Sequence, residues 1–203
     1  MIAGYIQVNL KNMLTELGED RVKSILSEFS CPLNIDVETF LKQRAVEFAK
    51  QGIAATHLVF ASYKQQAVLV GYFTITSKFI IIHKGSTSNA LQKKIAKFAQ
   101  KDTLLKRYSM SVPLIAQLGK NYADNRNQMI SGDELLKLAC EKVHEIQLNL
   151  GGRFVYLECE EKERLLEFYR NNGFVNFGRR SLDKDEEEIM HGKYLIQMLR
   201  YLK

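Results

Sequence analysis

The sequence predicts an α/β or α+β protein built on a mixed sheet, and three observations support this. Runs rich in β-branched residues alternate with segments of helical spacing in the second half of the chain. Two apolar runs, Thr56–Ser62 and Ala67–Thr76, flank a polar stretch as in a hairpin. A long amphipathic segment, Asp133–Leu150, separates the apolar runs Met110–Leu118 and Arg153–Glu160. Because a helical crossover joins parallel strands, we expect one parallel pair in a mostly antiparallel sheet.

The first half supplies antiparallel strands and covering helices. Tyr5–Leu10 alternates as a short strand, and helical spacing follows from Leu14 to Gly18 and from Val22 to Phe29. Asp36 is expected to cap the next helix. The apolar face of that helix would be Phe40, Leu41, Ala45, Phe48 and Ala49.

The second half is predicted to alternate strands and helices. Lys78–Lys84 reads as a strand or as the continuation of the previous one, and Ser88–Ala99 has helical spacing. Pro113 interrupts Met110–Leu118, as a bulge or an edge strand tolerates. The amphipathic helix has its apolar positions at Leu135, Leu136, Ala139, Val143, Ile146 and Leu150. Expected at the end are a helix and two strands joined by the acidic loop Asp183–Glu188, over Lys162–Asn172, Phe174–Leu182 and Lys193–Leu202.

Length and composition exclude several classes of protein. A chain of 203 residues fits a single domain, and no apolar run approaches the roughly 20 residues that span a bilayer. The start of the chain is a poor signal peptide. Three scattered cysteines predict no disulfide framework and therefore favour the cytoplasm. The net charge is +6, and six cations gather between Lys93 and Arg107 against Asp102 alone. This patch is either a solvated helix face or a binding surface for phosphates or RNA.

Metal and nucleophile sites have little support. Cys140 and His144 are four residues apart on a predicted helix, but no second pair with metal-site spacing accompanies them, so no metal is expected. Cys159 alternates with buried positions as a packed thiol, and nothing pairs it with His57, His83 or His191. Ser111 and Ser131 lack a nucleophile-elbow context.

The loop before the long helix is a candidate phosphate site, because a helix N-terminus presents unpaired N–H groups. Gly132 lies where the helix opens, and Asp133 and Glu134 follow it. These acids suit a purely structural helix start and oppose an anion. Nothing here matches a Walker loop or a dinucleotide fingerprint, so the loop by itself leaves both readings open.

The order of the pieces resembles the GNAT superfamily of acetyl-CoA-dependent N-acetyltransferases. In that family a strand enters a pyrophosphate loop, Gln/Arg-x-x-Gly-x-Gly/Ala, and then a helix. Ser111–Gly119 is similar to the strand, and Gly132–Leu136 to the helix entry. In this alignment Ile130 replaces the first glycine and Asn127 the Gln/Arg. Gln117–Asn121 is a second partial match. The family's later Phe-Tyr-x-x-x-Gly-Phe signature is present as Phe168–Phe174, although Lys162 replaces a common asparagine.

The resemblance covers about residues 56–177 and implies a fold and a cofactor. The fold would be a mixed, mostly antiparallel sheet with helices on both faces and a splayed parallel strand pair, in one domain over residues 1–203. Residues 1–50 would supply the first strand and helices, and residues 174–203 the last strands. The cofactor would be acetyl-CoA as co-substrate. Its binding residues would be Leu114, Ile115 and Gln117 on the strand, and Asn127, Gln128, Ile130, Ser131, Gly132 and Asp133 at the loop.

The same resemblance implies that Tyr169 is the general acid that protonates the departing thiolate. Read by itself, Tyr169 is better explained as a core aromatic on an amphipathic helix. Glu158 is a candidate base, with Glu160 as its neighbour on the same side of the strand as Tyr156; both could instead be solvated carboxylates.

The expected function is N-acetyl transfer from acetyl-CoA to an amine by direct attack on the thioester. The acceptor would be a small molecule or a protein amine. One alternative is a toxin-like enzyme that acetylates aminoacyl-tRNA, for which the Lys93–Arg107 patch would serve. The other is an inactive GNAT-fold module that binds CoA or regulates a partner. The sequence leaves RNA binding and the oligomeric state open, a homodimer included.

Overall fold

The structure is a computed structural model that describes residues 4–183 and 193–203. Most of the predicted acidic loop therefore lies outside the described residues. The chain divides into two compact units, each made of two segments: residues 1–76 with 115–141, and residues 77–114 with 142–203. The described strands hydrogen-bond in the order β1-β2-β3-β5-β6-β8-β7, and β4 pairs with β5. The predicted mixed sheet is confirmed, and the prediction of a single domain stays a prediction.

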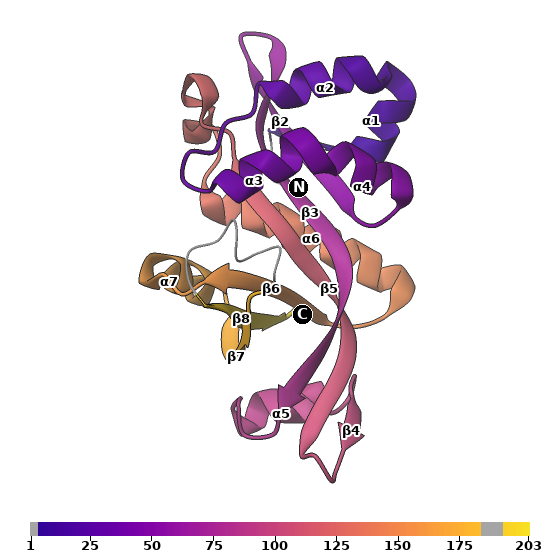
Figure 1. Ribbon diagram of the computed structural model, residues 1–203, viewed down its shortest axis with the longest axis vertical. Helices are drawn as coiled ribbons and strands as arrows, with labels where there is room; N and C mark the ends of the chain where they lie inside the picture. The colour runs from indigo at the N-terminus through magenta and orange to yellow at the C-terminus, as the bar shows by residue number, and fades with distance from the viewer. Residues whose placement is uncertain (1–3, 184–192) are drawn as a thin grey trace. The chain divides into compact units, whose positions relative to one another are not determined.

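The first unit begins with a strand and a run of short helices (Figure 1). These are β1 (Tyr5–Asn9), α1 (Leu10–Leu17), α2 (Glu19–Ser27), α3 (Ile35–Thr39), a π-helical segment η1 (Phe40–Arg44) and α4 (Ala45–Gln51). The predicted cap Asp36 is wrong: α3 is capped by Asn34, which is extended and accepts from the N–H groups of Asp36 and Val37. The Asp36 carboxylate is used elsewhere, because it accepts from the side chain of Gln117 at 3.0 Å.

A tight hairpin joins β2 (Ala55–Tyr63) and β3 (Gln66–His83). Its two turn residues, Lys64 and Gln65, have φ of 48° and 65°, as a type I′ turn requires. The predicted hairpin is therefore confirmed, and Lys78–Lys84 continues β3 as far as His83. One face of these strands packs against α1–α4 through an apolar core that includes Leu26, Leu41 and Tyr72. On the other face, Leu135 of α6 contacts Gly71, so helices cover both faces in this unit.

Within the second unit, a lobe formed by residues 77–114 contains the ends of β3 and β5 (Arg107–Lys120), with α5 (Asn89–Ile95) and β4 (Gln100–Asp102) between them. Sequence reasoning missed β4 and extended α5 too far, to Ala99. The end of β3 and the start of β5 pack against α5 through an apolar cluster that contains Ile80, Ile82, Ile95 and Met110.

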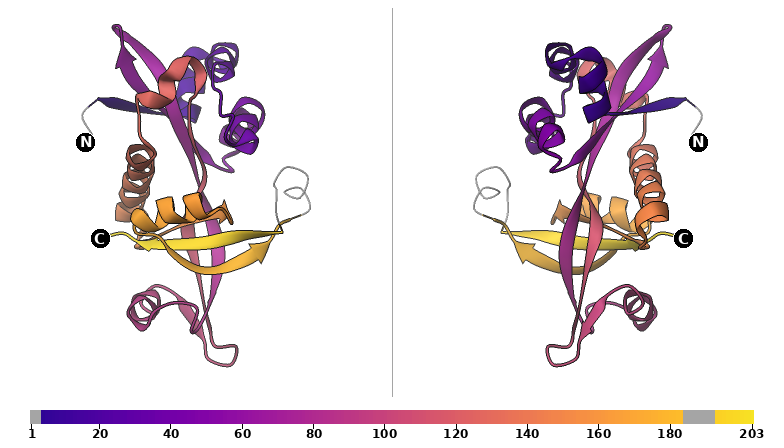
Figure 2. Two further views of the ribbon diagram at one scale, coloured as in Figure 1. Left: turned by 90° about the vertical axis from the view of Figure 1, so that its left-hand side faces the viewer. Right: turned by 90° about the vertical axis from the view of Figure 1, so that its right-hand side faces the viewer.

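The last elements are α6 (Gly132–Leu150), β6 (Phe154–Glu160), α7 (Glu163–Asn171), β7 (Val175–Ser181) and β8 (Tyr194–Tyr201). In the second unit β8 pairs antiparallel with both β6 and β7. Figure 2 shows α7 and α5 on opposite sides of β8. Leu150 is 80% exposed, so its predicted place on the apolar face of α6 is wrong. Among the described residues, no helix is long and apolar enough to cross a bilayer.

Candidate functional site

The predicted pyrophosphate loop ends in a reciprocal capping box. The Ser131 N–H donates to a Glu134 carboxylate oxygen at 2.8 Å, and the Glu134 N–H donates to the Ser131 hydroxyl at 3.1 Å. These bonds to Ser131, backbone first, hold the pKa of the Glu134 carboxyl below its usual range. Two N–H groups of the helix start are thus already bonded, and an anionic carboxylate lies beside them.

The rest of the loop is anchored by its own polar groups. A 3-10 helix, η2 (Ala123–Gln128), spans the part where an irregular loop was expected. Asn127 accepts at its carbonyl from Lys120 Nζ at 2.9 Å, and Gln128 is exposed. Ile130, at the usual glycine position, is 1% exposed, so its side chain serves the core. Gly132 is half-buried and Asp133 exposed.

The second partial match, Gln117–Asn121, has a packing role. A Cβ on Gly119 would lie 2.4 Å from Val37 Cγ1, so the glycine is needed for the strand to approach α3. Asn121 is fully buried. Its side-chain Nδ2 donates to the Leu69 carbonyl, and its side-chain Oδ1 accepts from the N–H groups of Ser30 and Ala123. These contacts hold the end of β5 in place within the first unit.

The two parallel strands β5 and β6, which were predicted to splay apart, share very little pairing. Among the described residues, the parallel pairing of β5 with β6 consists of one register pair, Leu114 opposite Tyr156. Pro113, which has no N–H, directly precedes this pair. Leu114 and Gln117 are half-buried, and Ile115 is buried.

Tyr169 lies in the last turns of α7 and is held by aromatic packing. Its ring is 5.0 Å from that of Phe168 and 5.9 Å from that of Phe174, both in edge-on geometry. The residue as a whole is half-buried. Burial of the phenol, and then the nearby Cys159, raise its pKa well above the usual value. Within the described residues, no group hydrogen-bonds to this hydroxyl, so its O–H is available to donate to a ligand.

Glu158 is the centre of a buried polar network. Its carboxylate accepts from Arg180 at 2.8 and 2.6 Å, from Lys78 at 3.3 Å, and from the Tyr156 hydroxyl. Its side chain is 9% exposed, so it is not a solvated strand-end carboxylate. Burial raises the pKa of Glu158, but the bonds from Arg180 and Tyr156 and the charge of Lys78 outweigh this, and the net pKa is lowered. Such a group accepts an amine proton poorly, which favours a structural role.

The other carboxylate and thiol candidates also have partners. Glu160 pairs with Lys162 at 2.7 Å. Burial raises the pKa of the Cys159 thiol to about 11, and its sulfur packs against Met198 Sδ at 4.0 Å. Cys31, Cys140 and Cys159 are buried thiols, and none of these three forms a disulfide. Residues 4–183 and 193–203 hold no cluster of three His, Cys, Asp or Glu side chains that could bind a metal.

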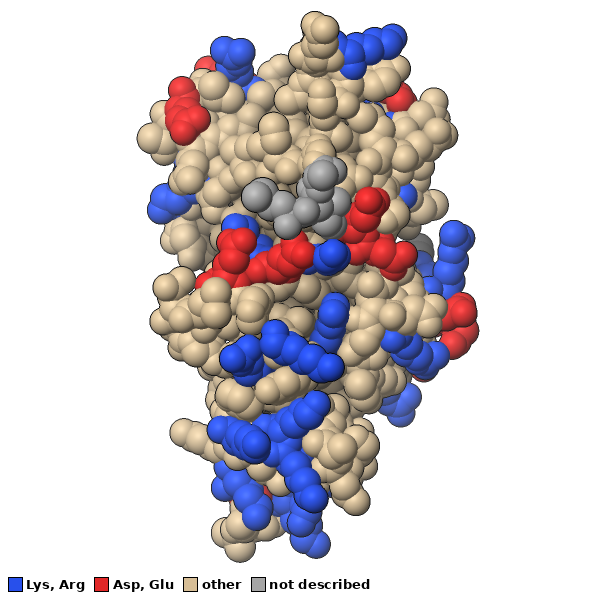
Figure 3. Space-filling model, turned by 180° about the vertical axis from the view of Figure 1, so that it is seen from behind, with Lys and Arg blue, Asp and Glu red and all other residues tan. Residues whose placement is uncertain are grey.

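A strongly basic surface covers the lobe formed by residues 77–114, which we call the basic lobe. It holds eight Lys and Arg and one Asp, a net charge of +7 against +6 for the whole chain. In Figure 3 these cations gather at the end of the second unit that carries α5 and β4. Arg107 pairs with Asp102 at 3.4 Å. In the described part of the chain, no carboxylate pairs with the exposed Lys84, Lys93, Lys94, Lys97, Lys101 and Lys106.

Solved structures identify the fold. The protein AtaT, "complexed with acetyl-methionyl-tRNAfMet", superposes with a TM-score of 0.61 at 16% identity, covering 95% of this chain and 93% of that one. A tyrosine-to-phenylalanine variant of KacT gives 0.61 at 15% identity over 96% and 94%. AtaTR "bound with AcCoA" gives 0.56 at 15% identity over 97% and 94%. The chain has the GNAT fold. No family model and no curated protein matches the sequence.

The structure confirms the fold that the resemblance implied. Sequence reasoning missed two partners of Glu158. Arg180 and Lys78 come from strands distant in sequence from Glu158, so spacing could not bring them together. The sequence does contain a signal for Gln147, because it lies four residues after Val143 and therefore on the apolar face of the predicted helix. In the structure its exposed fraction is 5%.

Proposed function

We propose that this protein is an N-acetyltransferase that uses acetyl-CoA, with Tyr169 as the general acid. The observation that carries this is a half-buried phenol, held by aromatic packing and without a hydrogen-bond partner among the described residues, in the Phe168–Phe174 segment of a chain with the GNAT fold. The neighbour AtaTR was solved with AcCoA, which supports the choice of co-substrate.

The reaction needs one new bond and one proton donor. The amine nitrogen attacks the thioester carbon, the C–N bond forms, and the C–S bond breaks to leave the CoA thiolate. Tyr169 donates its hydroxyl proton to that sulfur as negative charge develops there. The attacking nitrogen loses a proton to solvent, and the Tyr169 phenolate takes a proton back from solvent. The raised pKa keeps Tyr169 protonated at neutral pH. Because Glu158 is bonded to two cations, we assign no base.

The pyrophosphate would be held at the start of α6, by the N–H groups that the capping box leaves. The buried Ile130 and the Glu134 carboxylate oppose tight binding there. These two features favour the alternative of an inactive module, so the first test is binding. A rise in melting temperature with sub-millimolar CoA would support both readings in which the chain binds CoA, the enzyme and the inactive CoA-binding module. The absence of such a rise would contradict both.

We further propose the α-amino group of an aminoacyl-tRNA as the acceptor. AtaT was solved with acetyl-methionyl-tRNA, and the unpaired lysines of the basic lobe supply the charge that an RNA needs. The choice of tRNA over other acceptors depends on the basic lobe, since a small amine or a protein lysine would not require such a surface.

The test is release of free thiol from acetyl-CoA with a panel of charged tRNA, a polyamine and a lysine peptide. We expect turnover with charged tRNA that falls steeply with salt and is lost in the Lys93→Glu, Lys94→Glu, Lys97→Glu triple variant. A control triple variant reverses the exposed Lys11, Lys64 and Lys137 instead and should keep activity. Equal losses in both variants would contradict the assignment to the basic lobe, and turnover only with small amines would contradict the RNA acceptor.

A further inference from the structure

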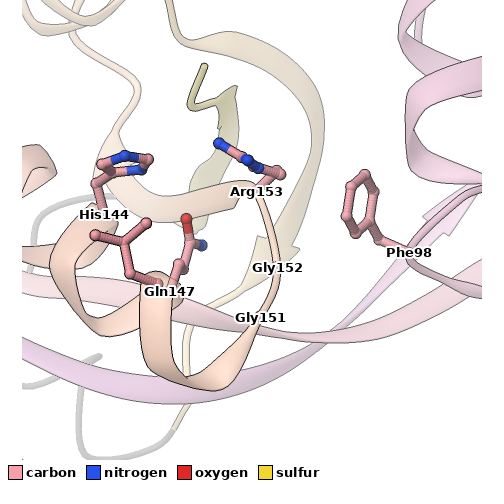
Figure 4. Close-up of a pocket in the computed structure, with 7 residues that line it drawn as sticks. Phe98, His144, Gln147, Gly151, Gly152 and Arg153 are labelled. Carbon is pink, nitrogen blue, oxygen red and sulfur yellow. The ribbon is translucent and has the colours of Figure 1, made fainter.

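A small pocket lies at the C-terminal end of α6, entirely within the second unit (Figure 4). Its volume is about 240 Å³, and its lining comes from Phe98 after α5, from the last turns of α6, and from the segment that enters β6. The lining side chains are Phe98, His144, Gln147, Leu148 and Arg153, with the backbone of Gly151 and Gly152. The proposed pyrophosphate loop is at the first turn of the same helix, so the pocket is a separate feature.

Two buried hydrogen-bonding atoms in this pocket have no partner within the described residues. They are Oε1 of Gln147 and Nδ1 of His144. The Gln147 orientation is fixed, because its Nε2 donates to the Phe154 carbonyl at 2.7 Å and its oxygen is left as an acceptor. His144 Nδ1 is an acceptor when the ring proton is on Nε2. An unpaired buried acceptor costs free energy, so in that tautomer both atoms favour a ligand that brings hydrogen-bond donors.

The other walls favour a flat, anionic ligand. Phe98 stands across the pocket from His144 and Gln147 in Figure 4 and is 41% exposed. Its ring is held in edge-on contact with Phe154 at 5.8 Å. Arg153 is exposed, and Lys94 lies 4.6 Å from the ring centre of Tyr201, which also packs against Phe98. A stacking surface flanked by cations suits a base with its phosphate.

We propose that this pocket binds one nucleotide with an unstacked base that carries an exocyclic amino group, presented by a single-stranded stretch of RNA. The amino group would donate both of its hydrogens, one to Gln147 Oε1 and one to His144 Nδ1. The base would stack on Phe98, and its phosphate would pair with Arg153. Cytosine, adenine and guanine have such a group and uracil does not. The proposal requires no acetyl transfer and can fail independently of the proposed function.

The test compares CMP with UMP, which differ at the group in question, by NMR titration of the whole protein. We expect CMP to bind about tenfold more tightly than UMP, a free-energy difference of about 1.4 kcal/mol. His144→Phe keeps the ring shape and removes the acceptor, so the preference should shrink while UMP affinity stays. Phe98→Leu should weaken both nucleotides about tenfold. Arg153→Gln should weaken both and reduce the salt dependence, whereas the control Arg21→Gln, an exposed arginine in α2, should change neither.

Three results would overturn the proposal. These are the absence of shifts in the His144 ring signals with any nucleotide, equal affinity for CMP and UMP, and a preference unchanged in His144→Phe. A short oligocytidylate should bind more tightly than CMP, because the neighbouring lysines contact further phosphates. Equal affinity for the two would assign the pocket to a free nucleotide and overturn the RNA source.

Discussion

The two ends of α6 differ in how their polar groups are used. At its start, Ser131 and Glu134 bond to each other, and Lys120 is bonded to Asn127. At its end, Gln147 and His144 each keep a buried atom without a partner in the described residues. The half-buried Tyr169 hydroxyl likewise has no hydrogen-bond partner among the described residues, whereas Glu158 is bonded like the residues at the helix start. Internally bonded residues at these positions therefore build the fold, and function is better sought at polar groups that have no internal partner.

The largest loss of stability is expected from Glu158→Gln. Removing the charge leaves Arg180 and Lys78 facing a neutral amide in a mostly buried site, which should lower the free energy of unfolding by about 3 kcal/mol. Urea unfolding measures it, with the exposed Glu167→Gln as the control. A stable variant that loses only turnover would contradict the structural role and restore Glu158 as a base.

The same pair of proteins tests the pH dependence. The pKa of Glu158 in the folded protein lies below its ordinary value of 4.5. Its contribution is therefore complete above the pKa of the unfolded chain and is lost as pH falls through the folded value. The stability gap between the wild type and Glu158→Gln should be constant near pH 7 and narrow below about pH 4.5. A gap that widens in acid would have the wrong sign.

Gly119→Ala should cost the next largest amount, about 1–3 kcal/mol, because the new methyl overlaps Val37. Adding Val37→Ala makes room and should restore part of the loss relative to Val37→Ala alone. Additive losses in the double variant would show that the close approach is not what requires glycine at position 119.

Ser131→Ala should lower stability by about 1 kcal/mol, since the Glu134 N–H loses its cap. Thermal unfolding with and without CoA sharpens the comparison between the two ends of the helix. Serine at an exposed site away from caps, Ser24→Ala in α2, is the control. A loss no larger than that control would mean that the capping box contributes little.

Much of the fold and part of the candidate site could be predicted from the sequence, and the parts that could not be predicted have physical causes. The hairpin turn at Lys64, the helix over residues 133–150 and the Phe168–Phe174 segment follow from local patterns. Local spacing also predicted a helix start near Gly132, yet it could not tell that Glu134 turns back onto Ser131. The network around Glu158 depends on strand register, and the pocket depends on Phe98 facing the end of α6. Both are long-range, and no short segment encodes them.

Tyr169→Phe tests most directly whether polar groups without an internal partner carry the function. Turnover of acetyl-CoA should fall about 100-fold or more, while the free energy of unfolding stays within about 0.5 kcal/mol of the wild type. Tyr201→Phe, another tyrosine of the second unit, should keep both values. Full turnover by Tyr169→Phe, or a loss of activity that merely follows a loss of stability, would contradict a role for Tyr169 as the general acid.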